Sequence, residues 1–576
     1  MPNTKENLNE IRHSTSHLLA YAVQELFGNQ VKFAIGPTID DGFYYDFDLG
    51  QQTFTPEDLK KIEAEMAKLI KQKLPFEKFD LPIEAALEKM AGQPYKQELI
   101  RDLAADGATE VSFYTVGDFT DLCKGPHVNN TKELGAFKLM KIAGAYWKGS
   151  EKNKMLQRIY GTAFATKEEL AAHLEMIAEA EKRDHRKLGK ELGLIAFHDE
   201  GPGFPFFKPK GMAVWNELLA YWRQMHAEAG YSEIKTPIML SQRLWEISGH
   251  WENYRENMYE TTIDEEKFAI KPMNCPGGLL MYKEDLHSYR DLPLRWGEIG
   301  LVHRHELSGV LSGLFRVRAF HQDDAHIFMR PDQIKDEILG VLNLVDQMYA
   351  AFGLSYHLEL STRPEKSIGS DEAWATATAG LKEALDGTGK DYKINEGDGA
   401  FYGPKIDIHI KDAIGRTWQC GTIQLDMNLP ERFQLAYIDA DGQEKRPIMI
   451  HRVIYGSLER FLGVLIEHYA GAFPAWLSPV QAVIIPVSEK FNGYGQKILT
   501  ELQAAGLRAE LDDADESLGK RIRNAEKQKT PYILVVGDKE QTAGTVAVRK
   551  RIEGDLGAVK IEDFIKNIKK EIEEKK

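Results

Sequence analysis

Apolar positions recur with the period of a helix in the N-terminal part of the chain. The segment 6–27 carries one apolar stripe, made of Leu8, Ile11, Leu18, Leu19, Ala22 and Leu26. Residues 56–72 repeat this pattern and start with suitable capping residues, because Thr55 suits the N-cap, Pro56 the first helical position and Asp58 the third. The pattern therefore predicts two amphipathic helices near the N-terminus.

Two changes of pattern divide the rest of the chain. Residues 167–192 are strongly charged and predict a long helix between two domains, and the Gly- and Pro-rich segment 201–211 begins a new domain. After Pro474, strand-like apolar runs alternate with helical segments, and a basic helix over 560–574 closes the chain. This order predicts a small α/β domain with a mixed sheet. Its strands are expected at 480–487, 507–513, 531–537 and 545–551, and its helices at 490–506 and 518–529.

Residues 294–328 predict two antiparallel strands around the loop HELSGVLSG. The second strand has one polar face and one mostly apolar face, and only His321 and Asp323 interrupt the apolar face. A polar strand face usually lies in solvent, but a histidine, a carboxylate, two guanidinium groups and an aromatic ring together favour a binding site. A period of two puts these groups on one face: Arg316, Arg318, Phe320, Gln322, Asp324 and His326.

Composition narrows the class of protein. The chain has 576 residues, too many for one core, so about three or four domains are expected. No apolar run approaches the ~18 residues of a membrane span, and the polar N-terminus lacks the apolar core of a signal peptide. Three widely spaced cysteines argue against a disulfide framework and for the reducing cytosol, so a cytoplasmic location is expected.

The formal net charge of −15 does not suggest a nucleic-acid binder. However, acidic and basic residues nearly balance over 477–576, so the acidity lies upstream of this segment. RNA binding would therefore depend on local basic patches rather than on the charge of the whole chain.

Three residues that are far apart in the chain have the composition of a catalytic zinc site. Cys275 lies in KPMNCPGG, His326 in QDDAHIF and His451 in MIHRVIYGSLERF. One thiolate and two imidazoles supply three protein ligands and leave the fourth position of zinc open, which is typical of a catalytic site. An amino alcohol can bind such an open zinc through its amine and its hydroxyl.

Several segments resemble those of class II aminoacyl-tRNA ligases. Residues 230–240 resemble motif 1, with Pro237 at a dimer interface; 303–306 and 316–328 resemble motif 2, and 450–468 resemble motif 3. Four further segments are similar to those specific to threonine: 183–194, 368–374, 400–408 and 416–426. With the three zinc positions, the chain is identified as a member of the threonyl-tRNA synthetases over essentially its whole length.

The resemblance implies how ATP is bound. The chain lacks a P-loop, so phosphate binding would come from arginines, whose planar fork suits phosphate. Arg304 would hold the α-phosphate and the substrate carboxylate, and Arg316 and Arg460 the outer phosphates. Phe320 would stack on adenine and Glu306 would meet its amino group. Mg²⁺ is expected with the ATP, and Arg304 and Arg460 would stabilise charge during the reaction.

The resemblance also implies the basis of amino-acid selection. Threonine and valine are nearly isosteric, and an apolar pocket separates such a pair by only ~10². One zinc ion per subunit, ligated by the substrate hydroxyl, would reject valine more strongly. Asp324 would accept a hydrogen bond from that hydroxyl, and Gln322, Tyr402 and Gln424 would line the pocket. Serine would pass this filter, so hydrolytic editing of seryl-tRNA is expected.

The N-terminal region matches the editing domain of the bacterial members of this family. Two spaced pairs, HxxxH and CxxxH, and two further residues carry the match: His13, His17, Lys96, Asp121, Cys123 and His127. The same pairs also have a zinc-ligand spacing, but the family implies a metal-free hydrolytic site. Ser14 stands where HExxH proteases have glutamate, so protease activity is not expected.

These expectations combine into an α+β multidomain protein. Its catalytic domain would hold the antiparallel sheet of class II synthetases, between an α+β editing domain and an α/β anticodon-binding domain. The expected partners are tRNA(Thr), ATP, L-threonine and a second copy of the chain in a homodimer, with no membrane. The predicted boundaries are 1–165 for editing, 166–192 for the linker helix, 193–476 for catalysis and 477–576 for anticodon binding.

The chain departs from the family in two places. His13 comes almost at once, so the ubiquitin-like domain that usually precedes the editing domain is not expected here. Ala514-Asp515-Glu516-Ser517 replaces the Arg-Asn-Glu-Lys stretch of many relatives, which puts anticodon recognition there in doubt, whereas Glu540 and Arg549 match. The alternatives are an RNA-binding regulator, a class II ligase for another amino acid and a standalone deacylase.

Overall fold

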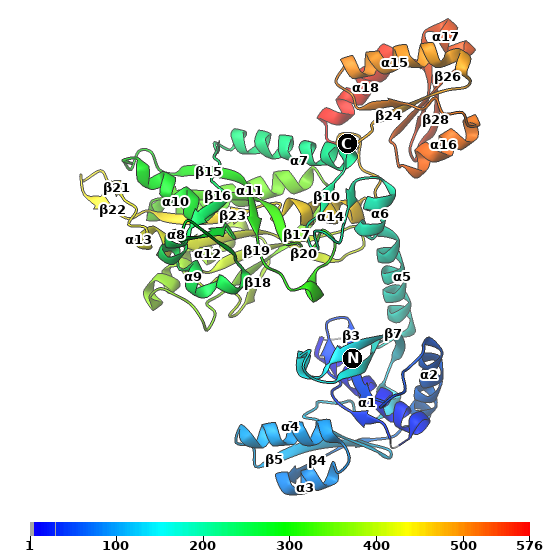
Figure 1. Ribbon diagram of the computed structural model, residues 1–576, viewed down its shortest axis with the longest axis vertical. Coiled ribbons are helices and arrows are strands. Elements are labelled where there is room, and N and C mark those ends of the chain that lie inside the picture. The colour runs from blue at the N-terminus through cyan, green and yellow to red at the C-terminus, as the bar shows by residue number, and fades with distance from the viewer. Residues whose placement is uncertain (1–4, 29) are drawn as a thin grey trace. The chain divides into compact units, whose positions relative to one another are not determined.

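The computed structural model describes residues 5–28 and 30–576, which form two compact units, Met1–Ala178 and Glu179–Lys576 (Figure 1). The mixed helix and sheet architecture expected from the sequence is confirmed. Within the described residues, no helix combines the length and the apolar character needed to span a membrane.

The first unit packs two helices on an antiparallel sheet. Helix α1 (Lys5–Phe27) buries the middle of the predicted stripe, including Leu18, Leu19 and Ala22, but Leu26 at its end is 42% exposed. Helix α2 (Pro56–Lys71) starts at the predicted cap, where the carboxylate of Asp58 accepts from the backbone nitrogen of Thr55 at 3.0 Å. The sheet comprises β1 (Lys32–Phe33), β2 (Thr38–Ile39), β3 (Gly42–Asp48), β7 (Ala136–Tyr146) and β8 (Met155–Phe164).

A smaller layer of the same unit carries the rest of the candidate editing residues. Its three antiparallel strands are β4 (Phe76–Pro82), β5 (Glu110–Val116) and β6 (Phe119–Leu122). Its helices are α3 (Ile83–Lys89) and α4 (Pro94–Ala105). Strand β6 contains Asp121 and leads directly into Cys123, while α4 carries Lys96.

The predicted single helix over 167–192 is two helices, α5 (Lys167–Arg183) and α6 (His185–Glu191). Asp184 ends the first and caps the second, since its side chain accepts from the backbone nitrogen of Arg186 at 2.8 Å. The next residue, His185, is buried: its Nδ1 lies 2.7 Å from a carboxylate oxygen of Glu467, and its Nε2 accepts from the backbone nitrogen of Leu314. These contacts outweigh the helical propensity of the charged segment.

The second unit is built around an eight-stranded sheet in the order β11-β15-β16-β23-β20-β19-β17-β18. The pairs β11–β15 and β17–β18 are parallel and the others antiparallel. The strands are β11 (Ser232–Glu233), β15 (Leu294–His303), β16 (Ala319–Met329), β17 (Ser355–Ser361), β18 (Tyr392–Asn395), β19 (Lys405–Lys411), β20 (Thr417–Asp426) and β23 (Ile448–Val453).

Helices and small sheets surround this sheet. Its core contains side chains of α7 (Pro209–Glu228), α11 (Ile334–Ala350), α12 (Asp371–Thr388) and α14 (Leu458–His468). Shorter helices are α8 (Gln242–Ser248), α9 (His250–Asn253), α10 (Cys275–Glu284) and α13 (Asn428–Arg432). A separate small sheet comprises β12 (Met239–Ser241), β14 (Glu266–Ile270) and β13 (Tyr259–Ile263). Two further pairs of strands are β9 (Ile195–Ala196) with β10 (Phe206–Phe207), and β21 (Tyr437–Ile438) with β22 (Glu444–Lys445).

The C-terminal part of this unit is the predicted mixed sheet, in the order β25-β24-β26-β27-β28. The predicted strands appear as β24 (Ala482–Pro486), β25 (Ala509–Leu511), β26 (Tyr532–Val536) and β27 (Thr545–Lys550). The predicted helices appear as α15 (Asn492–Ala504), α16 (Leu518–Lys527) and α18 (Ile561–Glu573). The sequence pattern missed α17 (Asp538–Ala543) and β28 (Gly554–Lys560).

Candidate functional site

Cys275, His326 and His451 come together at one face of the large sheet. His326 on β16 and His451 on β23 are cross-strand partners, with ring centroids 5.1 Å apart. Cys275 is the first residue of α10, and its sulfur and one ring nitrogen of each histidine lie within 4.8 Å of one another. All three residues are buried.

The donor set fits a zinc ion. Burial lowers the pKa of His326 to about 4, which favours the neutral imidazole that binds metals, whereas burial raises the pKa of the Cys275 thiol, which would lose its proton on binding the ion. The Nε2 of His326 is buried without a hydrogen-bond partner, and a metal would satisfy it. Asp426 accepts from Nε2 of His451 at 2.9 Å, which fixes the orientation of that ring.

A cavity of about 310 Å³ opens beside Cys275 and His451. Its lining includes five further residues that the sequence singled out: Arg304, Gln322, Asp324, Tyr402 and Gln424. Asn274 donates to the carboxylate of Asp324 at 3.1 Å, and Tyr402 donates to Gln424 at 2.5 Å. The polar face of β16 therefore lines a cavity from Phe320 to Asp324 instead of facing bulk solvent.

A second cavity, of about 410 Å³, is lined by all five residues that were predicted to bind ATP. Arg304 lines both cavities, and its guanidinium lies 5.1 Å from the centre of the Phe320 ring. Arg316 and Glu306 form an ion pair at 2.9 Å. The Nε of Arg460 is buried without a partner, while its Nη1 donates to a backbone oxygen. Arginines with free donors around an open cavity suit a polyphosphate.

Arg316 and Arg318 were expected on the second strand, but β16 begins only at Ala319. Arg318 holds the preceding loop instead, because its guanidinium donates to the backbone oxygens of Glu306 and Pro202. Arg316 still lines the second cavity from this loop.

The two polar interruptions on the apolar face of β16 hold the turn before α14. The buried carboxylate of Asp323 accepts from the backbone nitrogens of Ile454, Tyr455 and Gly456 at 2.8–3.2 Å. His321 lies 2.9 Å from a carboxylate oxygen of Glu459 in the first turn of that helix. As predicted, Ser457 is the N-cap of α14 and accepts from the backbone nitrogen of Arg460.

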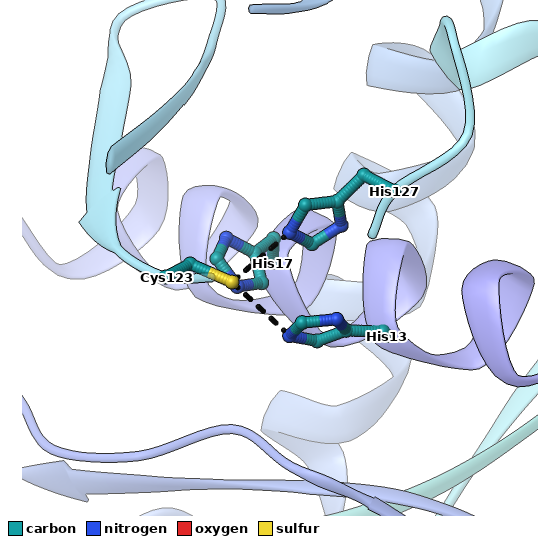
Figure 2. A group of neighbouring side chains, drawn as sticks. All are labelled: His13, His17, Cys123 and His127. Carbon is teal, nitrogen blue, oxygen red and sulfur yellow. Dashed lines mark hydrogen bonds between the residues drawn. The ribbon is translucent and has the colours of Figure 1, made fainter. Parts of the chain in front are cut away.

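The candidate editing residues form a cluster in the first unit. Figure 2 shows Cys123 between His13 and His127, with its sulfur 3.3 Å from Nε2 of His13 and 3.2 Å from Nε2 of His127. His17 lies one helical turn from His13, and its Nδ1 is buried without a partner. Ser14 lies 3.0 Å from Nδ1 of His127.

Burial sets the charge state of this cluster. It lowers the pKa of His13, His17 and His127, and it raises the pKa of Cys123 to about 11. The imidazoles are therefore neutral near pH 7 and the thiol is protonated. His13 also lines an open cleft of about 530 Å³ together with Pro37, Thr38, Gly125 and Pro126.

Lys96 and Asp121 lie beside the histidine cluster and form an ion pair with each other. The ammonium group is 2.5 Å from one oxygen of Asp121, and Tyr45 donates to the other oxygen at 2.6 Å. The carboxylate of Asp121 also lies 3.9 Å from Nε2 of His17. Since both side chains are only 3–4% exposed, they form a buried network rather than an open pair.

The two candidate anticodon residues lie on different elements of the C-terminal part. Glu540 is in α17, where its carboxylate accepts from the backbone nitrogen of Gly537 at 2.9 Å. Arg549 is in β27, opposite Ile533. In the divergent stretch, Ser517 precedes α16, and Glu516 pairs with Lys520.

The sequence did not predict the roles of several residues in these sites. Asn274 lies in KPMNCPGG and Asp426 at the end of segment 416–426, but the role of each depends on contacts across the fold. Tyr45 had no local signal, because a tyrosine within an apolar strand normally indicates core.

Three protein-family models match the chain. The "tRNA synthetase class II core domain (G, H, P, S and T)" matches residues 259–469, the "Anticodon binding domain" 481–571, and the "Threonyl and Alanyl tRNA synthetase second additional domain" 111–160. The first match covers the lining of both cavities apart from Tyr254, and the last match covers Asp121, Cys123 and His127.

Curated relatives are similar over nearly the whole chain. The chain is 59% identical to a threonine–tRNA ligase of Clostridium tetani, covering 99% of this chain and 89% of the relative. It is 61% identical to that of Acetivibrio thermocellus, covering 98% and 88%.

Two solved structures resemble about two thirds of the chain in fold and sequence. An RNA binding domain of threonyl-tRNA synthetase from Cryptosporidium parvum Iowa II has a TM-score of 0.64 at 42% identity, covering 67% of this chain and 98% of that one. A putative threonyl-tRNA synthetase of Aeropyrum pernix has a TM-score of 0.61 at 30% identity, covering 68% and 97%.

Proposed function

The chain belongs to the threonine–tRNA ligase family, and from this premise we propose how its residues divide the reaction. The enzyme uses ATP to join L-threonine to tRNA(Thr) through a threonyl adenylate, and it edits mischarged seryl-tRNA(Thr) by hydrolysis. Mg²⁺ accompanies the ATP. Similarity over almost the whole chain sets aside a standalone deacylase and a ligase for another amino acid.

The first step takes place where the two cavities meet. The carboxylate of threonine attacks the α-phosphorus of ATP, a new P–O bond forms, and the bond to pyrophosphate breaks. We assign Arg304 to the carboxylate and the α-phosphate, because it is the candidate arginine that lines both cavities. Arg316 would leave Glu306 to bind the outer phosphates together with Arg460, and Glu306 would then meet the adenine amino group. Adenine would displace the Arg304 guanidinium from the Phe320 ring.

The second step transfers the threonyl group to tRNA. A ribose hydroxyl at the tRNA end attacks the acyl carbon, and AMP leaves as the new ester forms. The residues named here act by positioning and charge stabilisation, which is sufficient for a reaction between bound and aligned substrates.

Cys275, His326 and His451 are the residues that would hold zinc. When bound there, zinc supplies a centre that ligates both the amine and the hydroxyl of threonine, which valine cannot match. Asp324 would accept a hydrogen bond from the hydroxyl, and Asn274 keeps this carboxylate in place. Gln322, Tyr402 and Gln424 would close the pocket around the substrate methyl group.

The N-terminal cluster would carry out the editing. We assign His13 to orienting the hydrolytic water, since it is the cluster member that lines the open cleft. Cys123 and His127 would contact the terminal ribose and the seryl group. Because Lys96 is held by Asp121, we assign this pair to fixing His17 rather than to the water itself.

We further propose three domains, a linker and a homodimer. The domains would be 1–165, 193–476 and 477–576, with 166–192 as the linker between the first two and with Glu540 and Arg549 facing the anticodon. Ile238 and Met239 follow Pro237 and are about 42–43% exposed, so the motif 1 segment offers an apolar surface to a second copy. Sedimentation at micromolar concentration should show twice the chain mass of 65.3 kDa, and a monomer there would contradict the dimer.

The proposed specificity for threonine rests on one observation: the cluster of three zinc-type ligands borders the cavity that Arg304 lines. Measuring ATP–pyrophosphate exchange with each of the twenty amino acids tests it. Threonine should give the fastest exchange, serine should follow and valine should be strongly disfavoured. Equal exchange with valine and threonine would contradict the proposed selection.

A further inference from the structure

Two histidines and a glutamate, none of them among the residues assigned above, meet on β17 and β19 (Figure 1 labels both strands). His357 and His409 occupy directly opposite positions on these antiparallel strands. Glu359 lies two residues after His357, so its side chain is on the same face of the sheet. The imidazole rings stack with centroids 4.9 Å apart and an angle of 13° between their planes.

Both imidazoles direct Nε2 toward the same carboxylate. Nε2 of His357 is 3.4 Å from one oxygen of Glu359, and Nε2 of His409 is 3.6 Å from the other. These distances exceed the about 2.7–2.9 Å of a charge-assisted hydrogen bond. They are close to the separation of about 3.4 Å between two ligands that each lie about 2.0–2.1 Å from a tetrahedral metal ion.

The surroundings leave these donors available. The side chains of His357, His409 and Glu359 are 37%, 20% and 19% exposed, so water can fill the remaining positions around an ion. Burial lowers the pKa of His409, which favours the neutral imidazole that binds metals. By contrast, His185 near Glu467 uses both ring nitrogens in hydrogen bonds within the protein.

Neighbouring charges do not occupy the cluster. Asp407, the strand partner of Glu359, is already bound by Lys405 at 2.8 Å and by the side chain of Gln419 at 2.6 Å. The charge of Lys405 is therefore neutralised by Asp407 and Asp398, so Lys405 does not need Glu359 as an ion-pair partner. Rigid strands hold the three donors, which favours a defined geometry.

We propose that His357, Glu359 and His409 form a second metal site, which binds a divalent transition ion such as Zn²⁺. Two imidazoles, one carboxylate and open positions are a ligand set that such ions accept. The ion would fasten β17 to β19. Residues 362–404, which include α12 and Tyr402 of the amino-acid pocket, connect these strands, so the ion closes a long segment of chain at its base.

Metal content and thermal stability test the site in the full-length protein. The parent and the variants His357→Asn, Glu359→Gln and His409→Gln are dialysed against micromolar Zn²⁺, and bound zinc is then counted per chain. His198→Asn is the matched control, because His198 is an exposed histidine on another segment. Circular dichroism confirms folding, and Glu359→Gln keeps the shape of its side chain should a histidine variant fail to fold.

The parent and the control should hold one zinc ion per chain more than each of the three cluster variants. Adding Zn²⁺ should raise the Tm of the parent and the control by several degrees more than that of the variants. Co²⁺ at this site should lack the thiolate charge-transfer band that Cys275 would give, which separates the two sites. Equal zinc content and equal Tm shifts in all five proteins would overturn the proposal.

Discussion

The carboxylate of Asp323 lies 2.8 Å from the backbone nitrogen of Gly456, and through this contact β16 holds the turn before α14. Gly456 has a φ of +80°, and a Cβ there would lie 2.3 Å from the backbone oxygen of Cys420, so glycine is required. The same turn leads into Arg460, which lines the nucleotide cavity. A buried carboxylate outside the cavity therefore positions a residue inside it.

Asp323→Ala should weaken both the fold and nucleotide binding. Three buried backbone nitrogens would lose their acceptor, and each unsatisfied donor costs about 1–3 kcal/mol. We expect a lower Tm and a higher KM for ATP in pyrophosphate exchange. Asp336→Ala, at an exposed position of α11, is the control and should change neither. An unchanged KM for ATP would show that the turn holds its shape without Asp323.

Cys275→Ser should remove one zinc ion per chain and with it threonine activation. The serine hydroxyl is a much poorer zinc ligand than a thiolate, and two histidines alone hold the ion weakly. Elemental analysis and pyrophosphate exchange measure the two effects. Cys123→Ser removes a thiol in the other unit and should keep both zinc and activation. Full activity of a zinc-free preparation would refute the zinc assignment.

Arg304→Ala should slow adenylate formation without unfolding the protein. A charge-assisted hydrogen bond contributes about 1.5–3 kcal/mol, which corresponds to roughly a 10- to 150-fold loss of exchange rate. Arg290→Ala, on an exposed loop, serves as the control. If exchange by the Arg304 variant matches the parent at equal Tm, Arg304 does not belong to the site.

Replacing both His13 and His17 by Ala should abolish editing and leave activation intact. The zinc-type cluster lies in the other compact unit, so threonine exchange should not change. Seryl-tRNA should accumulate, because hydrolysis loses the group that orients water. Clearance of seryl-tRNA at the parent rate would mean that the two histidines are structural.

Editing should persist below pH 6.5. Burial lowers the pKa of His13 from its usual 6.5, so the imidazole stays neutral and able to accept a proton as the pH falls past that value. The deacylation rate should therefore decline only at lower pH. The same shift reduces stability as the pH falls below 6.5, because the unfolded chain binds protons that the folded His13 does not. A rate that halves at pH 6.5 would contradict the burial of this residue.

Local sequence predicted the elements whose ends carry their own signals. The Thr55–Asp58 cap and the Ser457 cap appear where the pattern placed them, and the two antiparallel strands expected within 294–328 are present, although the second begins three residues after Arg316. The break at Asp184 was missed because it depends on Glu467, which is remote in sequence. Strand β28 was missed because its two glycines and exposed Leu556 give no alternating pattern.

In the candidate site, too, features with a local sequence signal were predicted and features that depend on remote contacts were not. Residue types and family motifs identified the donors, and the fold brings Cys275, His326 and His451 together. The groups that hold the donors, such as Asp426 and Asn274, were not identified, because only the folded chain shows which polar groups they meet. The pairing of Lys96 with Asp121 likewise follows from their shared burial.

The alternation of β16 limits how this enzyme can change during evolution. Odd positions such as Asp323 hold the turn before α14, and even positions such as Asp324 and His326 face the substrate side. Inserting or deleting one residue in this strand would exchange the two sets at once. New amino-acid specificities can therefore arise here by substitution, whereas length variation should be confined to the loop between β15 and β16.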